Sequence, residues 1–123
     1  MGRVFYNKLI RDNIPDKIKS LNETCDVRSI TDEQEFHQEL LKKVAEEASA
    51  LSTVSTREEF LSEYADLSIV LDELLKQQEI SETELQEAIA KNREKKGGFT
   101  KKLFLHWSSD ESYKSNETPQ GMK

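Results

Sequence analysis

The chain has 123 residues, a net charge of −6 and an aromatic content of 7%, which fits a single domain with a modest core. Its apolar residues recur at regular spacing, which favours a folded chain over a disordered one. No apolar run approaches the roughly 20 residues of a membrane span, and no signal-peptide core follows the first methionine. Because a single cysteine excludes an intrachain disulfide, we expect a cytoplasmic protein without a membrane partner.

Charge is divided unevenly along the chain. Residues 31–90 carry 16 acidic side chains against four basic ones. The first 19 residues carry five basic against two acidic, and residues 91–102 carry six basic against one acidic. A nucleic-acid-binding protein would need a broad basic face, so no nucleic-acid partner is expected. The pattern suits a site where metal ions meet a phosphorylated small molecule, although charge counts alone favour an ordinary solvated helix surface.

The first two helices are predicted from their starting residues. Pro15 suits the first turn of a short helix, which is predicted from residue 14 to about residue 21. Thr31, with Gln34 three residues later, forms a capping box, so Thr31 is the expected N-cap of a long helix over about 32–53.

Two further capping boxes predict two more helices, which begin after Thr56 and after Ser81. The first of these helices should end near residue 78 and the second near residue 96, because Gly97 and Gly98 follow. Residues 101–107 are expected to form a short strand or an extended arm, and residues 108–123 a disordered tail. The sequence therefore predicts an all-α bundle with a short N-terminal helix, in one domain over residues 1–107.

Glutamates lie inside the apolar stripes of the two long helices. With Glu47 set at zero and about 100° per residue, Leu40, Val44 and Leu51 fall within about 60° of it. Glu46 falls about 100° away, on the rim of the stripe. On the next helix Glu63 is again inside the apolar arc, and Asp66 lies one turn further, at its edge. Because helices joined by a short loop pack antiparallel, stripe to stripe, these carboxylates should converge.

Burying an unpaired carboxylate costs several kcal/mol, so this group needs a partner. A basic side chain is one option, but Lys42 and Lys43 are expected to face away or towards the rim. Protonation and cation binding are the others, and oxygen-only ligands favour a hard ion such as Mg²⁺ or Mn²⁺. A further interpretation is that Glu47 and Glu63 lie at the ends of the stripe and reach water.

Three stretches resemble one known family. Glu46-Glu47 followed by Glu63-x-x-Asp66 resembles the EExxE…ExxD signature of the all-α, MazG-like nucleotide pyrophosphohydrolase superfamily. The stretch YNKLIRDNIP at 6–15 is similar to the YNKLVRDKIP opening of its phosphoribosyl-ATP pyrophosphohydrolase-like branch, and Gly97-Gly98-Phe99 resembles that branch's ending. The resemblance covers residues 4–105. It implies a MazG-like helical bundle and Mg²⁺-dependent cleavage of nucleoside triphosphates, or of phosphoribosyl-ATP, between the α and β phosphates.

The resemblance also implies roles for individual residues. Glu47, Glu63 and Asp66 would hold Mg²⁺, with Mn²⁺ as an alternative, and Glu46 would orient or deprotonate the attacking water. Phosphate binding would fall to side chains near both ends of the domain: Lys8, Arg11, Lys91, Asn92 and Lys95. For each of the four lysine and arginine residues among them, a solvated surface charge is an equally good interpretation.

Ala50 departs from the family pattern, which has a third glutamate there that is commonly a metal ligand. Glu46 could bend in, water could take the position, or one metal could bind where relatives use more. Alternatively, catalysis has been lost. Since Mg²⁺ normally keeps several waters, one lost carboxylate weakens a site without abolishing it, and we favour an active enzyme.

The expected function is hydrolysis of NTP or dNTP to NMP and pyrophosphate, in a house-cleaning role. The alternatives are a nucleotide- or partner-binding relative that lost hydrolysis at Ala50, a phosphoribosyl-ATP pyrophosphohydrolase, and a purely structural bundle. MazG-like subunits generally pair, and the apolar stripes are wide for so small a chain. We therefore expect a homodimer or a dimer of dimers.

Overall fold

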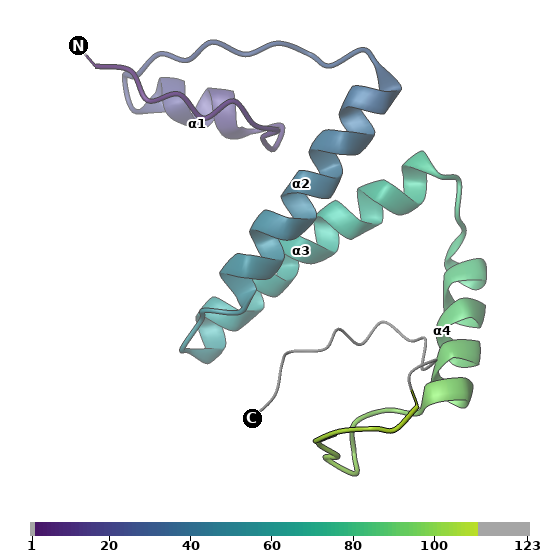
Figure 1. The fold of residues 1–123 in the computed structure, drawn as a ribbon. Helices are drawn as coiled ribbons and strands as arrows, with labels where there is room; N and C mark the ends of the chain where they lie inside the picture. Colours follow the sequence, from purple (N-terminus) through teal and green to yellow (C-terminus); the bar gives the residue numbers. More distant parts are fainter. Residues whose placement is uncertain (1, 111–123) are drawn as a thin grey trace. The chain divides into compact units, whose positions relative to one another are not determined.

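The computed structural model describes residues 2–110 of the chain. Within that range the protein is all-helical, with four helices and no strand, so the predicted all-α class is confirmed (Figure 1). The chain divides after Leu85 into two compact units. The expectation of one domain over residues 1–107 stays a prediction. None of the helices in the described range is long and apolar enough to cross a membrane.

The first unit begins with an irregular segment that leads into α1 (Ile14–Ser20). Pro15 lies in the first turn of α1, where its missing N–H costs no intrahelical hydrogen bond. The start at residue 14 is as predicted from the sequence. Leu9, in the segment before α1, packs against the hydrophobic core, so the N-terminal segment is anchored to the rest of the unit.

The helix α2 (Glu33–Leu51) begins one residue later than predicted. Its N-cap is Asp32, whose extended backbone turns the carboxylate to accept a hydrogen bond from Gln34 N–H at 3.1 Å. The prediction of Thr31 as the N-cap was therefore wrong. Both residue types cap helices well, and a carboxylate at the positive end of the helix dipole gains a further electrostatic advantage.

The helix α3 (Arg57–Gln77) follows α2 after a short loop, and the two form an antiparallel hairpin (Figure 1). Its predicted cap is confirmed: Thr56 Oγ1 accepts from Glu59 N–H at 3.1 Å. The same hydroxyl donates to the Glu59 carboxylate at 3.2 Å. The cap fixes where α3 starts and therefore which of its residues face α2.

The core of the hairpin is small. Only Leu40, Val70 and Leu74 are buried among the hydrophobic residues of the described range, and Leu9, Phe36 and Val44 pack against them while remaining partly exposed. Several large apolar side chains of α3 stay accessible, including Phe60 at 44% and Tyr64 at 54%. The apolar stripes predicted from the sequence are thus only partly covered within one chain.

The last helix, α4 (Glu82–Lys96), starts at the end of the first unit and continues into the second. Ser81 caps it by accepting from Glu84 N–H at 3.1 Å, as predicted. Gly97 ends it with a φ of 79°, a left-handed conformation that glycine adopts without steric cost. Residues 101–107 form no strand, and most of the predicted tail at 108–123 lies outside the described residues.

Candidate metal centre

Three carboxylates meet between α2 and α3. Glu47 comes from α2, and Glu63 and Asp66 come from successive turns of α3. One oxygen of each lies within 4.8 Å of the others, and all three residues are partly buried. Their convergence, predicted from the helix angles, is confirmed. Their role as metal ligands stays a prediction.

The chemistry of the donors fits a hard divalent cation. All three donors are carboxylate oxygens, which Mg²⁺ and Mn²⁺ prefer to nitrogen or sulfur. Oxygens bound to one Mg²⁺ at about 2.1 Å lie no more than about 4.2 Å apart. The three oxygens lie within 4.8 Å of one another, so the side chains would rotate to bring them onto one ion, with its remaining positions left to water or phosphate.

Lys43 lies beside these carboxylates, which the sequence reasoning did not foresee. Its Nζ lies 2.8 Å from Glu46 Oε1 and 3.5 Å from Glu47 Oε1. The side chain is only 13% exposed and its ammonium group lies near both Glu46 on the rim and Glu47 in the stripe, so Lys43 does not face away from the carboxylates. Lys43 is one turn before Glu47 on the same helix face, and a lysine stem can pack along apolar surface while its charged end reaches a carboxylate. That i, i+4 spacing is the sequence signal for this pair.

Glu46 lies on the rim, as predicted, with its side chain 40% exposed. Hydrogen bonds from Lys43 and then Lys8 lower the pKa of its carboxyl. A carboxylate with a lowered pKa accepts a proton less readily. Of the two roles expected for Glu46, orienting a water molecule therefore fits this environment better than deprotonating it.

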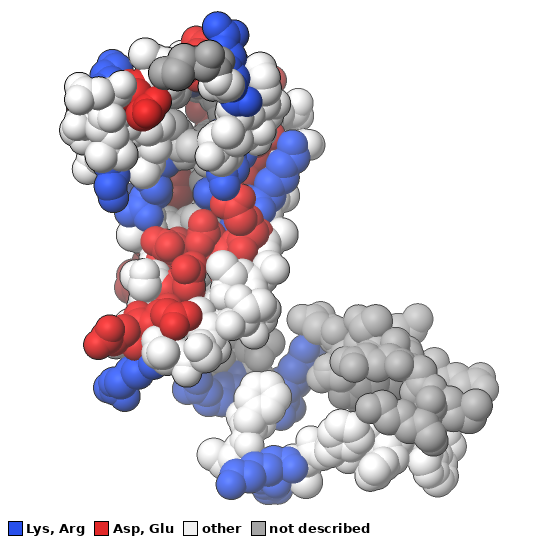
Figure 2. Space-filling model, turned by 90° about the vertical axis from the view of Figure 1, so that its left-hand side faces the viewer, with Lys and Arg blue, Asp and Glu red and all other residues white. Residues whose placement is uncertain are grey.

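The N-terminal segment brings two more cations to the same carboxylates. Lys8 Nζ lies 3.1 Å from Glu46 Oε2, and Arg11 Nη1 lies 3.7 Å from Asp66 Oδ1. Lys8 and Arg11 were expected to bind phosphate, and the structure places both beside the acidic cluster. Figure 2 shows acidic side chains gathered in a band on one face, with basic side chains bordering it.

Ala50 lies one turn beyond Glu46 on α2 and is partly buried. It offers no oxygen, so the cluster found among the described residues has three members. Glu46 is not one of them, because its carboxylate is engaged by Lys8 and Lys43. Glu46 thus adds no fourth carboxylate to the cluster in this structure.

The remaining predicted phosphate ligands, Lys91, Asn92 and Lys95, lie on α4 in the second unit. Asn92 lines a surface hollow of about 410 Å³ within that unit, together with Ile89 and Phe99. Binding of phosphate by these three residues stays a prediction.

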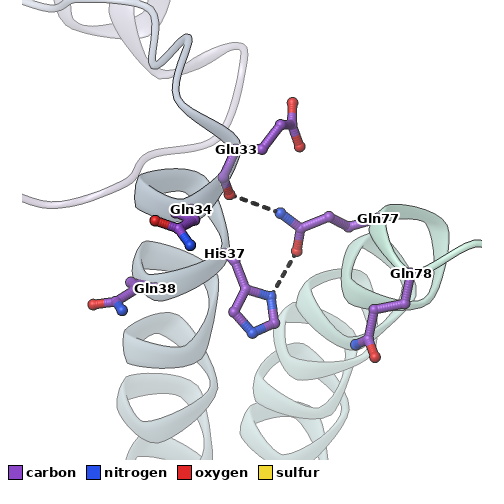
Figure 3. A pocket seen from close by; sticks show the side chains of 6 residues that line it. All are labelled: Glu33, Gln34, His37, Gln38, Gln77 and Gln78. Carbon is purple, nitrogen blue, oxygen red and sulfur yellow. Dashed lines mark hydrogen bonds between the residues drawn. The ribbon is translucent and has the colours of Figure 1, made fainter.

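A second polar constellation, not expected from the sequence, joins the N-terminal end of α2 to the C-terminal end of α3 (Figure 3). His37 Nδ1 lies 2.8 Å from Gln77 Oε1, and Gln77 Nε2 donates to the Glu33 carbonyl at 3.1 Å. The surrounding hollow has a volume of about 400 Å³ and is lined mainly by amides. His37 is ten residues, about 15 Å of helix, from Glu47, so this hollow is separate from the carboxylate triad.

No protein-family model, curated protein or solved structure matches the chain. The site is therefore defined by its own geometry: three convergent carboxylates, a largely buried lysine beside them, and two cations from the N-terminal segment.

Proposed function

We propose that the protein is a Mg²⁺-dependent nucleoside triphosphate pyrophosphohydrolase that cleaves between the α and β phosphates and releases pyrophosphate. The observation that carries the proposal is the convergence of Glu47, Glu63 and Asp66. Lys8 and Arg11 beside them support it, because phosphate transfer needs both a cation site and positively charged side chains at the substrate. A house-cleaning role in the cytoplasm is part of the same proposal.

In this proposal the chain's own residues divide the work. Glu47, Glu63 and Asp66 hold the divalent ion, and Glu46 orients the attacking water from the rim. Lys8 and Arg11 bind the outer phosphate oxygens. When bound, the metal ion offsets negative charge on the phosphates and lowers the barrier to attack.

A second candidate is a nucleotide-binding relative without hydrolytic activity. Two observations favour it: Ala50 removes one carboxylate, and the cluster already has lysine and arginine partners. A phosphoribosyl-ATP pyrophosphohydrolase would use the same residues on a larger substrate.

We also propose that the active form is a homodimer or a dimer of dimers. Phe60, Tyr64 and Leu71 fall within about 40° of one another around α3, and all three are at least 44% exposed. Three buried side chains are a small core for a folded unit, and an exposed apolar stripe of this kind marks a protein interface. A second copy of the chain would bury it.

The activity is tested by pyrophosphate release from a panel of canonical and modified nucleoside triphosphates, and from phosphoribosyl-ATP, with Mg²⁺ or Mn²⁺. Wild type is compared with Glu63→Gln, which removes a metal ligand, and with Ala50→Glu, which adds one. Glu58→Gln is the matched control, because it removes an exposed carboxylate from the first turn of α3. We expect turnover in wild type and the control, and a loss of about 100-fold or more in Glu63→Gln.

The other outcomes separate the candidates. Silence in wild type with activity in Ala50→Glu identifies a binding protein that lost hydrolysis. Silence in all variants, with no thermal stabilisation by Mg²⁺ or Mn²⁺, rejects the metal centre.

The oligomeric state is tested by analytical ultracentrifugation. Leu71→Lys should dissociate the dimer, whereas the control Ile69→Lys, on the opposite side of α3, should leave it intact. A monomeric wild type would reject the dimer.

A further inference from the structure

Four carboxylates and three basic side chains share one surface of the hairpin. Glu46, Glu47, Glu63 and Asp66 supply the negative charges, and Lys8, Arg11 and Lys43 lie within 4.0 Å of three of them. So many carboxylates repel one another, and the cations reduce that repulsion. Arg11 and Lys43, which pair with Asp66 and Glu47, also compete with a divalent ion for the carboxylates of the triad, whereas Lys8 pairs with Glu46 beside it.

The three cations are not equivalent. Lys43 is 13% exposed and contacts two carboxylates, so it belongs to the packed part of the hairpin. Lys8 and Arg11 are 40% and 51% exposed, and Arg11 lies 3.7 Å from Asp66, which is longer than a hydrogen bond. Exposed ion pairs of this kind shift an equilibrium by about fivefold at most, so they are readily exchanged.

We propose that Lys8 and Arg11 are exchangeable counter-ions beside the metal centre: without metal they pair with Glu46, next to the triad, and with Asp66, within it, and they move to the phosphates of the substrate once the triad holds a divalent ion. This inference rests on the proposed function. Leu9, between the two, stays packed on the core, so the exchange needs only side-chain rotation and not release of the segment.

The exchange sets the class of substrate. Lys8 pairs with a carboxylate of α2 and Arg11 with one of α3, so the two cations of the N-terminal segment lie beside different helices of the hairpin. A chain of phosphates can reach both cations and the metal ion, whereas a single phosphate group carries less negative charge and spans a shorter distance. Divalent metal and polyphosphate therefore bind cooperatively, and the monophosphate product is held less tightly than the substrate.

The test separates metal binding from phosphate binding. Mg²⁺ affinity is measured by calorimetry without any phosphate, and magnesium tripolyphosphate serves as a base-free probe of the phosphate site. In Arg11→Gln the competing cation is gone, so we expect Mg²⁺ alone to bind about threefold more tightly. The same variant should bind magnesium tripolyphosphate about tenfold more weakly, because a charge-assisted hydrogen bond is lost.

Arg28→Gln is the matched control for net charge. Arg28 pairs with Glu35 at the start of α2, about three turns from the triad, and both affinities should stay within twofold of wild type. The Nε–H signal of Arg11 in wild type reports the exchange directly. Its chemical shift should change during a Mg²⁺ titration, and the dissociation constant fitted to that change should equal the one measured by calorimetry. The chemical shift of the Arg28 signal should stay constant.

Opposite changes in the two affinities, together with the Arg11 shift, would support the exchange. If Mg²⁺ binds wild type but the Arg11 signal does not respond, or if Arg11→Gln binds Mg²⁺ no more tightly, the exchange is wrong while the proposed enzyme stands. If wild type binds no Mg²⁺ at millimolar concentration, both the metal centre and the exchange are rejected.

Discussion

Replacing Lys43 with methionine tests the balance of charge at the centre of the hairpin. Methionine keeps the length and apolar contacts of the lysine stem but removes the ammonium group 3.5 Å from Glu47, whose side chain is only 14% exposed. Among the described residues, Glu47 would then lose the lysine with which it pairs, and Glu46 would retain only Lys8. Removing one partner of such a pair costs about 1–3 kcal/mol, between the values for exposed and fully buried pairs.

For a unit of this size that cost lowers the midpoint of thermal unfolding by about 5–20 °C. The assay is circular dichroism during heating in EDTA and again in 10 mM MgCl₂. We expect Lys43→Met to be destabilised in EDTA and to gain more from Mg²⁺ than wild type, because the ion supplies the missing positive charge. Lys42→Met is the control, since Lys42 is 71% exposed and pairs only with Glu39 among the ion pairs found.

The reasoning would be refuted if Lys43→Met unfolded at the wild-type temperature in EDTA. It would also be refuted if Lys43→Met and Lys43→Met/Glu47→Gln were equally destabilised. The double variant removes the carboxylate that the lysine offsets, so it should recover much of the loss.

Three further predictions concern the core, the rim carboxylate and a helix cap. Leu40 is 3% exposed, so Leu40→Ala should cost about 3 kcal/mol in urea unfolding, whereas Leu41→Ala, at a position 49% exposed, should cost less than about 1 kcal/mol. Lys43→Met should raise the pKa of Glu46 in the metal-free protein, measured by NMR titration, because Lys43 is the main cause of its lowering. Since the folded-state pKa is lowered, the stabilisation from ionised Glu46 is present at neutral pH and is lost as the pH falls through that pKa. Thr56→Ala should cost about 1 kcal/mol in the same urea experiment, because the cap on Glu59 N–H is lost.

Each of these predictions has a contradicting result. Equal costs for the two leucine variants would mean that the α2–α3 contact does not hold the unit together. An unchanged pKa of Glu46 in Lys43→Met would mean that Lys43 does not pair with Glu46 in solution. If Thr56→Ala is as stable as wild type, packing against α2 and not the N-cap hydrogen bond determines where α3 starts.

The order and type of the helices could be predicted because their ends are encoded locally. Pro15, Thr56, Ser81 and Gly97 act on the backbone within one turn, so their effects can be read from neighbouring residues. The error at Thr31 has the same origin, since two adjacent residues could both cap α2 and only their backbone geometry decides between them. How the segment before α1 folds back onto the hairpin has no such local signal.

The triad could be predicted because helix periodicity fixes which residues share a face. Glu47, Glu63 and Asp66 follow from angles alone once α2 and α3 pack antiparallel. The partners of these carboxylates could not be predicted in the same way. Arg11 reaches Asp66 across a long separation in sequence, and the position of Lys43 depends on how its flexible stem packs. Long side chains have many rotamers, and tertiary contacts select among them.

The bonds of Gln77 to His37 and to the Glu33 carbonyl have a mechanical consequence for the carboxylates. The hairpin is covalently closed by the loop after Leu51 and is hydrogen-bonded at its other end, with the triad between the two. Helices restrained at both ends cannot easily separate, so the distance between the carboxylates of α2 and those of α3 is set before any ion binds. Fixing that span in advance reduces the entropy lost on binding, and only the side chains remain to be ordered.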